Sequence, residues 1–294
     1  MVATKGELIR YLKAKDLEFA TLFYRRLQPT SEWLITQKVG SSLLSSQDDA
    51  EQTVATIGEQ TSVSKRVFRN FTSSQLLSHE CVDIYCKLFQ LRDNRIAETH
   101  HDVNSQRASY QQFGRSIFLG NSFCANLTST LLPDHIPLLL QQYFPADWKV
   151  EDTAFIFLML NCSLISEEPN PDSWSLIRID LLEHKLEYCD PRMDRSVSPL
   201  PEFAANNLRN AAINILTPVF RVLLPSYEGD WSISILENQY FSFLPIANQV
   251  DCGVYLLACV YFLVQHVPIS FDQECITRLR RQLAYWILCG SLPF

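Results

Sequence analysis

The chain has 294 residues, of which 47% are hydrophobic and 12% aromatic, so it can bury a substantial core as one large domain or as one domain with an appendage. Its 25 basic and 32 acidic side chains give a net charge of −7, which argues against a general nucleic-acid-binding surface. The longest apolar run, residues 254–264, is too short to span a membrane, and the N-terminus lacks the apolar core of a signal peptide.

The first 67 residues differ in character from the rest. Residues 1–39 are predicted to form a helical segment, because apolar side chains between residues 5 and 28 recur at helical spacings among Lys, Arg and Glu. Residues 40–67 are rich in Ser, Gln, Thr and Asp and contain no aromatic side chain whose burial could offset the entropy of ordering. We therefore expect a polar linker or mobile loop over residues 40–67 and the main domain over residues 68–294.

The main domain is predicted to alternate helices and strands. Residues 72–75 offer helix N-cap candidates, and apolar residues from 82 to 89 follow on one helical face. Residues 154–160 are continuously apolar, as in a strand buried on both faces. The other predicted elements are a β-hairpin of residues 174–181 and 186–190, a helix over 201–224, a strand over 231–236 and a helix over 272–289 with Gly290 as its C-cap. This order indicates an α+β protein with one core.

The candidate reactive residue is Cys252, which opens the apolar helical pattern of residues 254–264. Backbone N–H groups and the helix dipole favour the thiolate form of a cysteine in a first helical turn. Gly253 lets the backbone approach a substrate closely, and the N–H of Cys252 can donate to an oxyanion. The alternative for an isolated cysteine is a small buried hydrophobic side chain.

Several further segments stand in a specific order and spacing around Cys252. Trp174 begins a hairpin that ends at Asp190, and Asn248 lies four residues before Cys252. Together with residues 77–85, 121–127 and 278–280, these segments resemble the ubiquitin-like-protein (SUMO) specific cysteine proteases in order and spacing. The resemblance implies a papain-like α+β fold of the SUMO-protease type, with a central mixed sheet flanked by helices and the nucleophile at the N-terminus of a buried helix.

The resemblance also implies roles for individual residues. Cys252 would be the nucleophile, Asp190 would orient the catalytic base, and Trp174 would cover the channel for the Gly-Gly tail of a modifier. Leu76 stands in the place of the family's first channel tryptophan, although simple core packing is the alternative. The residues expected to contact substrate are Trp174, Gly253, Asn248 and Leu76.

Two positions depart from the family pattern. Ser173 occupies the position of the catalytic His, and Ile246 occupies that of the oxyanion Gln. A serine hydroxyl cannot act as a general base near neutral pH, and an isoleucine side chain cannot donate a hydrogen bond. Loss of a triad base costs on the order of 10⁴ to 10⁶ in turnover. We therefore expect impaired catalysis, while Gln249 remains an alternative oxyanion donor and one sequence leaves open whether Ser173 is natural or engineered.

No other histidine, metal or cofactor is expected to restore the chemistry. His184 is predicted at the hairpin turn, far from Ser173, and the further histidines are His79, His100, His101, His135 and His266. Cysteines and histidines lack structural-zinc spacing, and the scattered glycines form no phosphate-binding loop, so neither a metal nor a cofactor is predicted. Nine cysteines without a CxxC pair favour a reducing compartment, so we expect an intracellular protein of the nucleus or cytoplasm.

The favoured hypothesis is a catalytically impaired, protease-derived domain that binds a ubiquitin-like modifier or another protein. One alternative is an active deSUMOylating isopeptidase with a rearranged base. A second is a scaffold subunit of a larger assembly, with residues 5–28 as its partner surface. Acyl transfer ranks last because it needs the same missing histidine. The identity of the modifier and the oligomeric state stay open.

Overall fold

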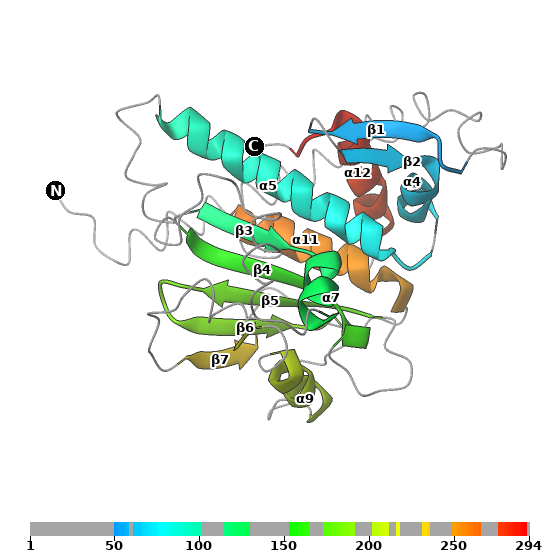
Figure 1. Cartoon of the computed structure of the whole chain (residues 1–294). Helices are drawn as coiled ribbons and strands as arrows, with labels where there is room; N and C mark the ends of the chain where they lie inside the picture. Colours follow the sequence, from blue (N-terminus) through cyan, green and yellow to red (C-terminus); the bar gives the residue numbers. More distant parts are fainter. Residues whose placement is uncertain are drawn as a thin grey trace.

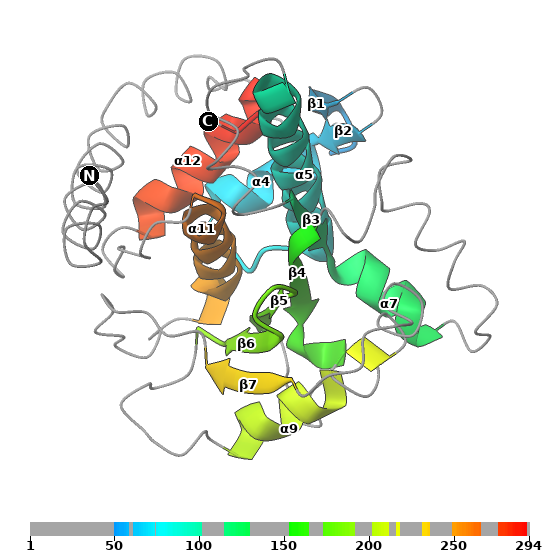
Figure 2. The same ribbon diagram turned by 90° about the vertical axis from the view of Figure 1, so that its left-hand side faces the viewer.

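The computed structural model describes residues 50–58, 61–73, 75–101, 115–129, 153–164, 173–191, 202–211, 216–217, 231–235, 249–265 and 276–292. These residues form a mixed β-sheet with helices on its two sides, together with a separate β-hairpin near the start (Figure 1). Seen from the side, α11 and α12 lie on one side of the sheet and α7 on the other (Figure 2). None of the described helices is long and apolar enough to cross a membrane.

The central sheet has five strands in the order β3-β4-β5-β6-β7. They are β3 (Arg115–Leu119), β4 (Thr153–Asn161), β5 (Trp174–Asp180), β6 (Lys185–Cys189) and β7 (Ser232–Ile235). The outer pairs β3–β4 and β6–β7 are parallel, and the inner pairs are antiparallel. The predicted buried strand, hairpin and later strand are all confirmed, and the sheet is mixed as the resemblance implies.

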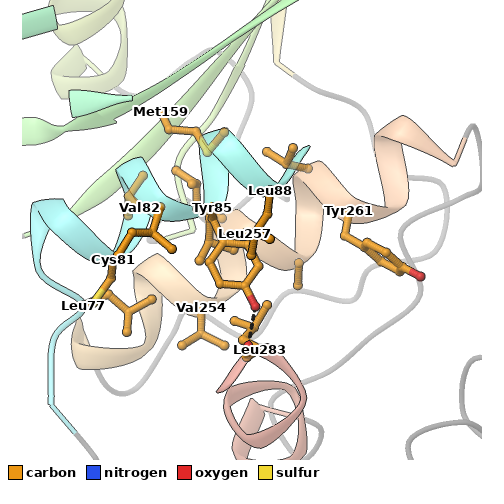
Figure 3. Close-up of a cluster of buried hydrophobic side chains, with 14 of the residues drawn as sticks. Leu77, Cys81, Val82, Tyr85, Leu88, Met159, Val254, Leu257, Tyr261 and Leu283 are labelled. Carbon is orange, nitrogen blue, oxygen red and sulfur yellow. Dashed lines mark hydrogen bonds between the residues drawn. The ribbon is translucent and has the colours of Figure 1, made fainter. Parts of the chain in front are cut away.

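The helices that follow the first hairpin and α4 (Lys65–Thr72) are α5 (His79–His101), α7 (Asn121–Ser129), α9 (Glu202–Ala211), α11 (Cys252–Val264) and α12 (Ile276–Cys289). α11 is buried on every side from Cys252 to Phe262, because its sequence is apolar all round and it lies between β5, α5 and α12. Figure 3 shows α11 side chains packed against Tyr85 of α5, whose hydroxyl donates to the Leu283 carbonyl of α12 at 2.5 Å. α11 is therefore the centre of the main core.

The prediction of a polar linker over residues 40–67 is wrong for its second half. Residues there form the antiparallel pair β1 (Thr53–Ile57) and β2 (Thr61–Ser64), followed directly by α4 (Lys65–Thr72). Ile57 and Val63 are fully buried, because the hairpin packs on α12 and α5. A few buried β-branched side chains are thus enough to hold this hairpin when a helix distant in the sequence covers them. The folded domain therefore already includes residue 50. Residues 1–39 lie outside the described residues.

Element boundaries also differ from prediction. The polar residues 72–75 do not cap the first long helix, which begins at His79; the side chain of Ser64 caps the earlier helix α4 by accepting from the Val67 N–H at 3.4 Å. The helix predicted over residues 201–224 is described as α9 over its first half. The last helix is described from residue 276 onward, and Gly290 follows it with φ +64°, as the C-cap prediction requires.

Candidate functional site

The site predicted around Cys252 lies at the first turn of α11. A short 3₁₀ turn, η5 (Gln249–Asp251), leads directly into the helix at Cys252. The structure therefore places this cysteine at a helix N-terminus as the sequence predicts. Its side chain is fully buried, and it belongs to the same apolar cluster as Trp174.

Trp174 and Gly253, which are 79 residues apart, meet at this turn. A Cβ placed on Gly253 would lie 3.1 Å from both Cδ1 of Trp174 and Cβ of Leu77. The indole Nε1 of Trp174 donates to the Leu77 carbonyl at 3.1 Å, which fixes the ring in its plane. The beginning of β5, the segment before α5 and the first turn of α11 are therefore in direct contact, and glycine at position 253 permits this contact.

Ser173 and Asp190 lie at the same end of the β5–β6 hairpin. Leu176 pairs with Cys189, so the register puts Asp190 opposite Ser175 and diagonal to Ser173, on the same sheet face. Such diagonal neighbours are about 7 to 8 Å apart, a distance that a side chain larger than serine can bridge. The hydroxyl of Tyr188 donates to Oδ2 of Asp190 at 3.3 Å, and both Ser173 and Asp190 are buried.

The Ser173 hydroxyl has no hydrogen-bond partner in the part of the chain that the structure describes. Its backbone carbonyl accepts from the Cys162 N–H at 2.8 Å, so the main chain is held while the side chain is not. A buried hydroxyl without a partner costs about 1 to 3 kcal/mol, a penalty usually avoided in folded proteins. The Ser173 hydroxyl therefore makes no bond to the Asp190 carboxylate, which lies diagonally across the hairpin.

His79 is the described histidine that lies beside Trp174, and its ring is held by Asn121. The two rings meet edge to face with centroids 5.6 Å apart. Oδ1 of Asn121 accepts from the Asn161 N–H at 3.1 Å, so its Nδ2 faces Nδ1 of His79 at 3.0 Å. The ring of His79 is thereby held by Asn121 beside Trp174, at the edge of the site. The sequence alone gave no sign of this contact, because Asn121 lies 42 residues away.

The remaining predicted residues divide into described and undescribed ones. His184 lies at the β5–β6 turn with φ +49° and stacks on Trp231, as expected for a turn residue far from Ser173. Leu76 is half-buried against the main core, next to Leu77, whose carbonyl holds Trp174. Asn248, Ile246, His135 and His266 lie outside the described residues.

Two further observations concern the composition and the burial of the site. Among the described residues, no three His, Cys, Asp or Glu side chains gather as a metal site would require, and no disulfide joins the cysteines. Cys252 and Trp174 are each 0% exposed, so the thiol and the indole are both covered in this structure. The first turn of α11, with its thiol, lies against Trp174, and the Asp190 carboxylate lies at the end of the adjoining hairpin, but the described residues place no imidazole at position 173 between them.

The fold is similar to that of solved SUMO proteases. The SUMO protease Ulp1 with its catalytic cysteine oxidized to a sulfonic acid matches with a TM-score of 0.58 over 89% of this chain and 95% of that chain. The C-terminal Ulp1 protease domain in complex with Smt3, the yeast ortholog of SUMO, matches with a TM-score of 0.59 over 90% and 96%. The Chaetomium thermophilum Ulp1-like SUMO protease catalytic domain matches with 0.56 over 84% and 86%.

Each of these structures is 14% identical in sequence to this chain, so the likeness concerns the fold. No protein-family model and no curated protein matches the chain. The predicted α+β fold of the SUMO-protease type is confirmed.

Proposed function

From this Ulp1-like fold we propose that the chain is a SUMO-protease-like domain that binds a ubiquitin-like modifier, or another protein, and hydrolyses peptide or isopeptide bonds poorly or not at all. One observation carries the proposal. Ser173 is buried at the end of the β5–β6 hairpin that carries Asp190, with a hydroxyl that bonds to neither a base nor an acid among the described residues. The position that would deprotonate Cys252 therefore holds a group that cannot accept its proton.

The size of the expected defect follows from the role of the missing group. A base that activates the thiol also returns a proton to the leaving amine, and its removal costs on the order of 10⁴ to 10⁶ in turnover. His79 is not arranged as its replacement in this structure, because Nδ1 of its ring is engaged by Nδ2 of Asn121 at 3.0 Å. Binding does not need the base, so affinity for a modifier can persist where turnover is lost.

The test is labelling with modifiers that carry a C-terminal electrophile. SUMO, ubiquitin and a NEDD8-like modifier are each incubated with the chain and with Ser173→His, and the adduct is located by mass spectrometry. We expect saturable labelling of Cys252 only in Ser173→His, because an imidazole there reaches across the hairpin toward Asp190. Cys252→Ser in the same background should abolish the adduct. Rapid labelling of the unaltered chain would refute the proposal and favour the active-isopeptidase alternative.

Binding is tested separately with unreactive modifiers. Trp174→Ala should weaken the affinity for the modifier, because the indole covers the turn where a C-terminal tail would lie. Trp231→Ala is the matched control, since that ring stacks on His184 at the opposite end of the hairpin. Equal affinity of both variants and the unaltered chain would remove the modifier as the partner of this site.

The complete burial of Cys252 and Trp174 favours a second candidate, a scaffold whose ancestral tail channel is closed. In that case neither the unaltered chain nor Ser173→His labels with any modifier. The two candidates thus differ in one measurable outcome, the labelling of the histidine variant.

A further inference from the structure

The guanidinium of Arg280, on α12, binds the peptide that immediately precedes Cys252. Its Nη2 donates to the Val250 carbonyl at 2.7 Å, and its Nε and Nη2 donate to Oδ1 of Asp251 at 3.0 and 2.9 Å. Its Nη1 donates to the Asn70 carbonyl of α4 at 3.0 Å. One side chain from the last described helix therefore bonds both to the 3₁₀ turn that precedes α11 and to the earlier helix α4.

This arrangement replaces an ordinary helix cap. Asp251 occupies the N-cap position of α11, but its side chain makes no capping bond to the first turn. Its carboxylate is turned to Arg280 instead, and both side chains are buried. The planar fork of an arginine, whose donors have fixed directions, suits three acceptors placed in this way. A buried ion pair adds little net stability, so its value here lies in fixing one geometry.

A second set of contacts leads from Arg280 to the other side of the cysteine. Asn70, whose carbonyl binds Arg280, accepts from the Ser78 N–H through its own Oδ1 at 3.2 Å. Ser78 follows Leu77, whose carbonyl holds the indole of Trp174. The guanidinium of Arg280 thus bonds directly to Asp251, which precedes Cys252. Through Asn70 and Ser78 it is also linked to the Leu77 carbonyl, which holds Trp174.

We infer that Arg280 is the positioning residue of the Cys252 site. It fixes the backbone conformation of the first turn of α11 and the position of Trp174 in contact with Gly253. The inference rests on the proposed function only in treating this turn as the binding site. Without the guanidinium, the carboxylate of Asp251 would be left buried and uncompensated, and the turn before Cys252 would open to hydrate it. The rest of α11 is held by apolar packing and would stay buried.

The test is alkylation of the native, full chain by N-ethylmaleimide, with each cysteine followed by mass spectrometry. Cys259 is the internal reference, because it lies on the same helix and is as buried as Cys252. Arg280→Gln should accelerate labelling of Cys252 about tenfold or more relative to Cys259, since an uncompensated buried carboxylate is costly. Arg280→Lys, which keeps the charge but loses the fork, should give a smaller acceleration in the same direction, and it carries the test if Arg280→Gln does not fold.

Arg115→Gln is the matched control. Arg115 is a half-buried arginine that also has a carboxylate partner, Asp93 at 3.5 Å, but it joins β3 to α5 away from the Cys252 turn. It should change the labelling of both cysteines by the same factor. Parallel acceleration of Cys252 and Cys259 in the Arg280 variants, or no change at Cys252, would overturn the inference. N-ethylmaleimide needs no modifier, so this outcome is independent of whether the proposed binding partner is correct.

Discussion

Replacing Gly253 by alanine tests the close contact that builds the site. The added Cβ would lie 3.1 Å from Cδ1 of Trp174 and from Cβ of Leu77, and 3.3 Å from Cδ1 of Leu77. Carbon atoms pack best at about 3.5 to 4.0 Å, so three contacts become too short at once. Both neighbours are fully buried, and Trp174 cannot move back without stretching its 3.1 Å bond to the Leu77 carbonyl.

Two opposing energies decide the sign of the effect. Alanine is more favourable than glycine inside a helix by about 1 kcal/mol, which would stabilise the variant. Overpacking of a filled core costs about 1 to 3 kcal/mol, and weakening the Trp174 hydrogen bond adds up to about 1 kcal/mol. The helix gain is reduced in the first turn, so we expect Gly253→Ala to lower the free energy of unfolding by about 1 to 3 kcal/mol.

Urea unfolding, followed by circular dichroism, measures this difference. Gly120→Ala provides a second overpacked variant, because its Cβ would lie 3.1 Å from Sγ of the buried Cys86 and closer still to Oδ1 of Asp83, and it should also lower the free energy of unfolding. A Gly253→Ala variant that is more stable than the unaltered chain would show that helix propensity prevails. The close contact between Trp174 and Gly253 would then be wrong, and so would the geometry of the site that rests on it.

Three further predictions concern the core and its titrating groups. Tyr85→Phe removes the buried hydroxyl that donates to the Leu283 carbonyl and should cost about 1 to 3 kcal/mol in urea unfolding; no loss would exclude that bond. Burial raises the pKa of the Cys81 thiol to about 11, so its alkylation in the native protein should stay slow at pH 8 and accelerate only as the pH approaches that value; fast labelling at pH 8 would contradict this. Burial also raises the pKa of Asp83 above its ordinary value of 3.8. The folded state then binds this proton more tightly than the unfolded state, so the free energy of unfolding should fall as the pH rises through the range in which Asp83 loses its proton. Urea midpoints measured between about pH 4 and pH 7 test this dependence, and Asp83→Asn should flatten it.

Local patterns in the sequence predicted much of the fold. The apolar run of β4, the alternation of the β5–β6 hairpin and the start of α11 at Cys252 each depend on neighbours within a few residues, and each is confirmed. The β1–β2 hairpin was missed because the surface that buries it belongs to α12, more than 200 residues later.

The candidate site was predictable in part for the same reason. Trp174 and Gly253 were identified by resemblance, and the structure shows that they touch. The bonds of Arg280 to Asn70 and Val250 join residues 210 and 30 positions apart, and no periodicity or spacing marks such pairs. The contact of His79 with Asn121 was invisible in the same way.

The bond between Arg280 and Asn70 also bears on how the protein is made. It closes a loop of 210 residues, and the Tyr85–Leu283 bond closes one of 198. A chain that emerges from the ribosome N-terminus first cannot form either bond until α12 has been synthesised, and such long-range contacts form late in folding. The turn that carries Cys252 would then gain its final shape only after α12 has been synthesised, so a nascent chain that still lacks α12 would present no finished binding site to a partner.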